Sequence, residues 1–153
     1  MKKKDLFKLN EGLGILKNLS GVKFAYAVAK NKVLISKEIE ALQESRKPNE
    51  KFKEYDKKRV ELCISFADKD EKNKPIIVNN QYQITKKEAF NIKINELQEE
   101  NKKIIEEVEK KQEEYLKMLE EETDLKFFMI KQDDLPKEIT VSQMDIVIDL
   151  IEE

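Results

Sequence analysis

The sequence predicts an α+β fold that is mainly helical. Its largest part would be a long antiparallel helical hairpin, similar to a coiled coil, with a small β-hairpin and short base strands. Three features predict this fold. Apolar residues recur at heptad spacing over residues 85–122, a second apolar stripe follows residues 22–68, and an Asn-Asn pair divides two β-prone runs within residues 75–84.

We expect a single domain over residues 1–153, with a base, a helical arm and a tip. The base would be residues 1–30 and 124–153, the arm residues 31–68 and 85–123, and the tip the β-hairpin at residues 75–84. Two short strands, residues 4–10 and 125–131, are expected to pair at the base. Phe7 and Leu9 would share one side of the first strand.

A short helix is expected between Glu11 and Leu19, ended by Ser20-Gly21. Gly12 and Gly14 within it resemble part of a phosphate-binding loop. The third glycine and the preceding strand of that motif are missing, so close packing or a turn is the favoured interpretation.

Residues 22–68 form the second long helical region. Pro48 lacks a backbone donor, which predicts a kink or break near residues 46–47. Cys63 falls on the apolar stripe and is expected to be a packed small side chain. The stripe consists of Phe24, Val28, Ile35, Ile39 and Leu42 before the break, and Phe52, Tyr55, Cys63 and Phe66 after it.

The β-hairpin is predicted by Pro75–Val78 and Gln81–Ile84, which flank Asn79-Asn80. Asparagine tolerates the positive φ of a two-residue turn. The charged turn before the hairpin lacks the oxygen ligands of a calcium loop, because Lys72 occupies one ligand position.

Residues 85–122 are expected to form one continuous helix about 55 Å long, since neither glycine nor proline interrupts them. Thr85 and Glu88 suggest a capping box at its start, and Asn101 would fix the register of the seam. The seam residues are Ile94, Asn101, Val108 and Tyr115 at position a, and Phe90, Leu97, Ile104, Lys111 and Met118 at position d.

From residue 98 onward, the g positions are Glu100, Glu107, Glu114 and Glu121, whereas the e positions are Gln98, Ile105, Gln112 and Leu119 and include no lysine. A parallel self-dimer held by g–e ion pairs is therefore excluded. Ile105 and Leu119 widen the apolar face, which predicts antiparallel packing on residues 22–68. Self-association as a dimer is also expected, through this face and the slim surface of Ala25, Ala27 and Ala29.

A solvated face explains most of these charges, but the same residues could bind a protein partner. The candidate interaction residues are Glu100, Lys103, Glu107, Lys110 and Glu114.

Near the end of the chain, Leu135-Pro136 predicts a turn. Thr140 and Gln143 predict a capping box, with Ile139 and Met144 as a hydrophobic staple. A last helix is expected over residues 141–152. Its apolar face would consist of Met144, Ile148 and Ile151.

Catalytic groups are scarce. The chain has no histidine, two arginines and no nucleotide, zinc or triad signature, so we expect no enzymatic activity, cofactor or metal. The net charge of −2 gives no strong field toward nucleic acid or membranes. A single cysteine and the lack of a signal-peptide core after Met1-Lys-Lys-Lys4 predict a cytoplasmic protein.

Several short motifs resemble a family of small, uncharacterised proteins from tailed phages and prophages of Gram-positive bacteria. These motifs are Phe24-Ala-Tyr-Ala-Val-Ala-Lys-Asn31, Lys37-Glu-Ile-Glu40, Arg46, Asn73-Lys-Pro75, Asp134-Leu-Pro136, Thr140 and Met144. The resemblance implies a phage-related setting inside a bacterial host, and it implies no particular activity.

The function expected on these grounds is a non-catalytic, phage-derived protein that binds a protein of host or phage. Inhibition of a host factor, as by an anti-defence protein, is the leading hypothesis. Two alternatives stay open: a structural or assembly coiled-coil protein of the phage, and a nucleic-acid accessory protein that holds phosphates through lysines.

Overall fold

The structure, a computed structural model, describes residues 1–152. It is mainly helical, with 66% of the residues in helices, and the described residues contain six α-helices and one two-stranded antiparallel sheet. The prediction of a mainly helical α+β fold is confirmed at this level. The chain divides into two compact units, which we call unit 1 (Met1–Arg46 with Glu113–Glu153) and unit 2 (Lys47–Gln112).

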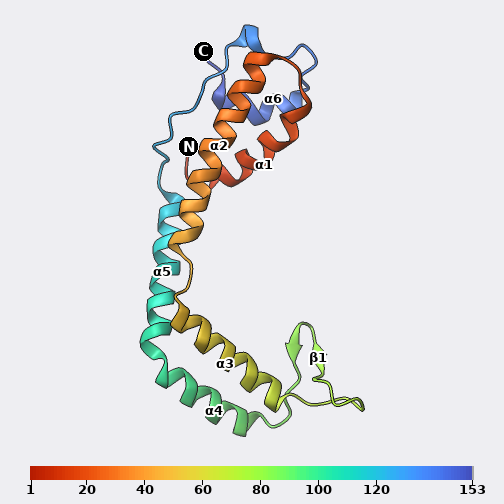
Figure 1. The fold of residues 1–153 in the computed structure, drawn as a ribbon, viewed down its shortest axis with the longest axis vertical. Coiled ribbons are helices and arrows are strands. Elements are labelled where there is room, and N and C mark those ends of the chain that lie inside the picture. Colours follow the sequence, from red (N-terminus) through yellow and green to blue (C-terminus); the bar gives the residue numbers. More distant parts are fainter. Residues whose placement is uncertain (153) are drawn as a thin grey trace. The chain divides into compact units, whose positions relative to one another are not determined.

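The core of unit 1 lies where α1 (Asp5–Ile15) contacts α2 (Val22–Ser45) and α6 (Val141–Val147), as Figure 1 shows. The apolar stripe predicted for the first half of the region 22–68 is confirmed, since all five of its members are buried. The fully enclosed side chains of this core include Leu6, Leu13, Leu16, Phe24, Ile35, Ile130, Val147 and Leu150.

The strand predicted at residues 4–10 is wrong, because these residues form the start of α1. Leu6, Leu9 and Leu13 recur at helical spacing, and all three are buried in the core. The helix predicted at residues 11–19 is therefore misplaced toward the C-terminus. The α-helix begins at Asp5 and ends at Ile15, and a single 3-10 turn, η1 (Leu16–Asn18), follows it.

The predicted pairing of residues 4–10 with residues 125–131 is also wrong. Ile130 instead forms an isolated parallel bridge with Ile151, in which the Ile130 amide donates to the carbonyl of Leu150 at 2.7 Å. Lys2, just before α1, bridges Glu122 in an antiparallel sense. The strand predicted at residues 125–131 is therefore also wrong, because within this segment only Ile130 forms a backbone bridge, and its partner is the last part of the chain.

Ion pairs reinforce the contact of the first residues with the end of α5 (Lys102–Glu120). The ammonium groups of Lys2 and Lys4 each lie 2.8 Å from the Glu120 carboxylate. The hydrogen bond from Lys2 has the largest effect on the Glu120 carboxylate, followed by the one from Lys4. Together they lower the pKa of Glu120 from its ordinary 4.5 to about 2.

The capping box at the start of α6 is confirmed. The Thr140 hydroxyl accepts from the Gln143 amide, and the Gln143 side chain accepts from the Thr140 amide at 2.9 Å. The helical face predicted for residues 141–152 is wrong in part, because α6 ends at Val147 and a 3-10 turn, η3 (Ile148–Leu150), follows. This tighter turn buries Val147 and Leu150 and leaves Ile148 57% exposed.

Unit 2 is built on α3 (Glu50–Phe66) and α4 (Lys87–Glu100), which lie side by side in Figure 1. The predicted helix break is confirmed, since α2 ends at Ser45 and α3 begins at Glu50. Asn49 caps α3, with its side-chain oxygen accepting from the Phe52 amide at 2.8 Å. Ring contacts between Phe66 and Phe90, 5.8 Å apart, join the two helices.

The β-hairpin is confirmed as β1 (Ile77–Val78) and β2 (Gln81–Tyr82), with Val78 opposite Gln81. Asn79 and Asn80 form the turn with φ values of 51° and 61°, the left-handed pair that a two-residue hairpin requires.

The continuous helix predicted over residues 85–122 is wrong, because it is interrupted at Asn101, where α4 ends and α5 begins. The Asn101 side-chain nitrogen donates to the Leu97 carbonyl at 2.8 Å, and the Asn101 carbonyl accepts from Ile104 and Ile105. Asparagine competes for backbone hydrogen bonds in this way, and it therefore ends one helix and starts the next.

The capping box predicted at Thr85 and Glu88 is wrong. The Thr85 hydroxyl donates to Asp68 at 2.6 Å, and α4 starts two residues later. The seam residues themselves are half-buried or buried throughout, whereas the paired glutamates between them are exposed. The helical face predicted to be covered is therefore the less exposed face, although the helix is not continuous.

Candidate protein-interaction site

Asn31 is a buried polar residue of α2, with a side chain that is 0% exposed. Its side-chain nitrogen donates to the Phe128 carbonyl at 2.8 Å, and its side-chain oxygen accepts from the Phe128 amide, also at 2.8 Å. The Asn31 amide thereby replaces a neighbouring strand and satisfies both backbone groups of Phe128. This residue holds the extended segment 125–130 on α2.

The side chains of this extended segment divide between the core and the surface. Leu125 and Phe127 pack against the core, whereas Phe128 and Met129 remain 40% and 43% exposed. On the adjacent surface of α2, Val22 is 89% exposed and Tyr26 56% exposed. Large apolar side chains from two separate parts of the sequence therefore gather on one surface.

Lys30 completes this surface. The rings of Tyr26 and Phe128 meet edge to face with centroids 6.1 Å apart, and the Lys30 ammonium lies 5.5 Å and 6.0 Å from the two centroids. Cation–π attraction keeps the ammonium beside both rings. We call Val22, Tyr26, Lys30, Phe128 and Met129 the aromatic-lysine patch.

A hollow of about 330 Å³ lies within the aromatic-lysine patch. Its apolar lining includes Val22, Tyr26, Ala27, Phe128 and Met129, and its charged lining is Lys23, Lys131 and Asp134. The Lys23 ammonium pairs with Asp134 at 3.1 Å. Among the described residues, neither Lys30 nor Lys131 forms an ion pair, and the lining of the hollow contains two lysines and one aspartate.

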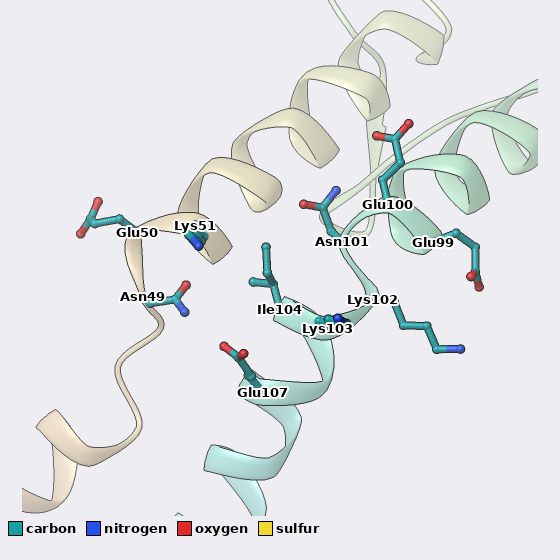
Figure 2. A pocket seen from close by; sticks show the side chains of 10 residues that line it. All are labelled: Asn49, Glu50, Lys51, Glu99, Glu100, Asn101, Lys102, Lys103, Ile104 and Glu107. Atoms are coloured by element: carbon teal, nitrogen blue, oxygen red, sulfur yellow. The ribbon is translucent and has the colours of Figure 1, made fainter.

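The residues proposed from the sequence lie elsewhere. Glu100, Lys103 and Glu107 line a separate hollow of about 810 Å³ in unit 2, at the interruption between α4 and α5. Figure 2 shows Ile104 pointing into this hollow near the start of α3, whereas Glu99 and Lys102 point away from it. Lys110 and Glu114 lie farther along α5 and are not among the residues that line this hollow.

The chemistry of the hollow in unit 2 favours no class of ligand. Lysines and glutamates alternate around it, so neither sign of charge dominates. Ile104 is its one large apolar side chain, and it is half-buried. This arrangement matches a solvated end of a helix pair better than a binding site.

Metal sites and membrane-spanning helices have no counterpart in the described part of the chain. Within residues 1–152, no three His, Cys, Asp or Glu side chains are placed together as metal ligands. In the same range, no helix combines the length and the apolar character that crossing a membrane requires. Cys63, the free cysteine, is half-buried in α3.

Sequence reasoning missed the aromatic-lysine patch. A signal was present, because Val22, Tyr26 and Lys30 recur every four residues in α2, away from the buried stripe. The sequence did not indicate that Phe128 would lie beside Tyr26, because about a hundred residues separate the two in the chain. That contact depends on Asn31, whose role as a backbone partner has no sequence signature.

Comparison of the chain with protein-family models, with curated proteins and with solved structures finds no match.

Proposed function

We propose that this protein acts by binding another protein and is not an enzyme. The observation that carries this proposal is the aromatic-lysine patch. Aromatic side chains and methionine are enriched in protein interfaces, and clustered exposed apolar residues mark interaction sites. The two hydrogen bonds of Asn31 hold the Phe128 backbone in place before binding, which reduces the entropic cost of forming an interface.

The proposed setting is a bacterial host that carries a phage or prophage. This part of the proposal rests on the motifs near Phe24 and Asp134 that resemble small phage proteins. The partner would be a host factor that the protein inhibits, as an anti-defence protein does. A structural role in phage assembly is the alternative, in which the partner would be a phage protein.

An affinity pull-down from bacterial host lysate tests the proposal, with the wild-type protein compared with the double variant Tyr26→Ser/Phe128→Ser. We expect a specific partner to be recovered by the wild-type protein and lost with the double variant. Leu116→Ser is the matched control, because Leu116 is 54% exposed and lies outside the aromatic-lysine patch.

Thermal melts of the three proteins must first show that each is folded. Recovery of no specific partner by the wild-type protein would count against the proposal. Recovery of the same partner by the wild-type protein and the double variant would show that binding uses another surface.

A further inference from the structure

We infer that the aromatic-lysine patch binds an acidic protein segment that carries at least one large apolar side chain. This inference rests on the proposed function and adds the chemistry of the partner. Its two parts, the negative charge and the apolar anchor, follow from different features of the patch.

The negative charge follows from the lysines. Lys23 and Lys131 line the hollow, and Lys30 lies beside the Tyr26 and Phe128 rings that form part of it, whereas Asp134 is the only acidic residue among the described residues that line it. Asp134 is already paired with Lys23, and Lys23 itself is 78% exposed. An approaching carboxylate can therefore pair with Lys30 or Lys131 without breaking an ion pair that the described residues make.

The geometry of Lys30 makes it the best-placed of the three. Its ammonium has three donors, and the faces of Tyr26 and Phe128 satisfy it only weakly. A carboxylate bound there would lie beside two exposed aromatic rings. Neighbouring apolar atoms of the same partner would then cover those rings and exclude water from the ion pair, which strengthens it.

The apolar anchor follows from the hollow. Its volume of about 330 Å³ and its lining of Val22, Tyr26, Ala27, Phe128 and Met129 can accept one large side chain. Interfaces commonly draw most of their binding energy from one or two such anchors. Met129 adds adaptability, because its unbranched side chain can adjust to different anchors.

A second copy of the chain in a symmetric arrangement is disfavoured. If two aromatic-lysine patches faced each other, each would bring Lys30 and Lys131 toward a surface that carries the same two lysines, and the like charges of the two surfaces would repel. The surface is therefore better suited to a segment of opposite charge than to its own copy.

Selection from a library of displayed random peptides tests the inference. The full-length wild-type protein serves as bait, and the Tyr26→Ser/Phe128→Ser variant removes peptides that bind elsewhere. We expect the remaining peptides to be acidic and to contain an aromatic or large aliphatic residue. The affinity of these peptides for the Lys30→Glu variant should be at least about fivefold lower than for the wild-type protein. Added salt should also weaken their binding to the wild-type protein.

Lys37→Glu is the control, because Lys37 is an exposed lysine of the same helix outside the aromatic-lysine patch. The selected peptides should bind the Lys37→Glu variant as tightly as they bind the wild-type protein. The inference is overturned if the selected peptides lack acidic residues, if no peptide depends on the two aromatic residues, or if Lys30→Glu binds unchanged. Circular dichroism melts confirm that each variant is folded.

Sedimentation of the wild-type protein and the double variant addresses the second copy directly. A wild-type dimer that becomes an 18.1 kDa monomer in the double variant would assign this surface to self-association and overturn the inference. If the lysate partner depends on the two aromatic residues while the selected peptides are not acidic, the proposed function stands and only this inference fails. If no lysate partner is found, the proposed function fails whatever the peptides show.

Discussion

At the scale of single residues, Gly12 and Gly14 share helix α1 but meet different surroundings. A Cβ on Gly12 would lie 2.7 Å from Cγ2 of Ile146, a residue of α6. A Cβ on Gly14 would meet only the Lys32 ammonium, at 3.3 Å. The first contact forces two packed elements apart, and the second is relieved when a flexible side chain moves.

Gly12→Ala should therefore destabilise the protein by about 1–3 kcal/mol, as overpacking does. Gly14→Ala should stabilise it by about 0.5–1 kcal/mol, because alanine loses less backbone entropy in a helix. Urea denaturation of the two variants checks the prediction. A Gly12→Ala variant as stable as the wild-type protein would contradict the close approach of α1 and α6.

Asn31 is the second residue whose effect can be stated in advance. Asn31→Ala leaves the amide and the carbonyl of Phe128 without their partner, which should cost about 1–3 kcal/mol. Asn91→Ala, at an exposed position of α4, is the matched control and should change stability by less than about 0.5 kcal/mol. Melting temperatures that fall equally in both variants would mean that Asn31 does not hold the segment 125–130.

At the scale of elements, the heptad register of α5 predicts a contrast between Ile104 and Glu106. Ile104 is half-buried at a seam position, whereas Glu106 is exposed. Ile104→Asp should lower the free energy of unfolding by about 1–3 kcal/mol, because a charge loses part of its hydration there. Glu106→Ala should change it by less than about 0.5 kcal/mol. Equal melting temperatures for the two variants would show that Ile104 faces solvent and that the register is wrong.

The contact between the first residues and the end of α5 should respond to pH. The pKa of Glu120 is lowered to about 2 by its hydrogen bonds with Lys2 and Lys4, against an ordinary value of 4.5. Because the pKa is lower in the folded protein, the stabilisation is complete above pH 4.5 and is lost as the pH falls toward 2.

Glu120→Gln removes this contribution. The difference in melting temperature between the wild-type protein and this variant should be largest at neutral pH, shrink below pH 4.5 and vanish near pH 2. Glu109→Gln, at an exposed position of the same helix, serves as the control. A difference that stays constant over this range would contradict the contact.

Elements with a strong local signal could be predicted from the sequence. The Asn79-Asn80 turn, the break before Asn49 and the capping box at Thr140 depend on residues that specify their own backbone geometry. The register of the seam was also predictable, because burial of one helical face requires only the spacing of apolar residues.

Elements that depend on distant contacts could not be predicted in the same way. The run at 4–10 contains too few apolar residues to separate strand from helix, and only packing on α2 and α6 shows that Leu6, Leu9 and Leu13 act together. The Thr85 hydroxyl could bond either to the backbone of the helix that follows it or to another side chain. In the structure it bonds to Asp68, which the hairpin connection brings near. The contact of Phe128 with Tyr26 has the same origin.

At the scale of the whole molecule, the chain combines an almost balanced charge with two compact units, described above as unit 1 and unit 2. The aromatic-lysine patch belongs entirely to unit 1, and the hollow lined by Glu100, Lys103 and Glu107 belongs to unit 2. We propose that the partner binds the first surface, so the two surfaces can be tested against each other in one experiment.

Hydrogen exchange of the full-length protein, free and bound to the partner recovered from lysate, makes that comparison most directly. We predict added protection over residues 22–31 and 125–131, because a segment covering the patch excludes water from both. Exchange over residues 99–114 should be unchanged. Protection confined to residues 99–114, with none at residues 22–31, would contradict the account and assign binding to the glutamate-rich helix.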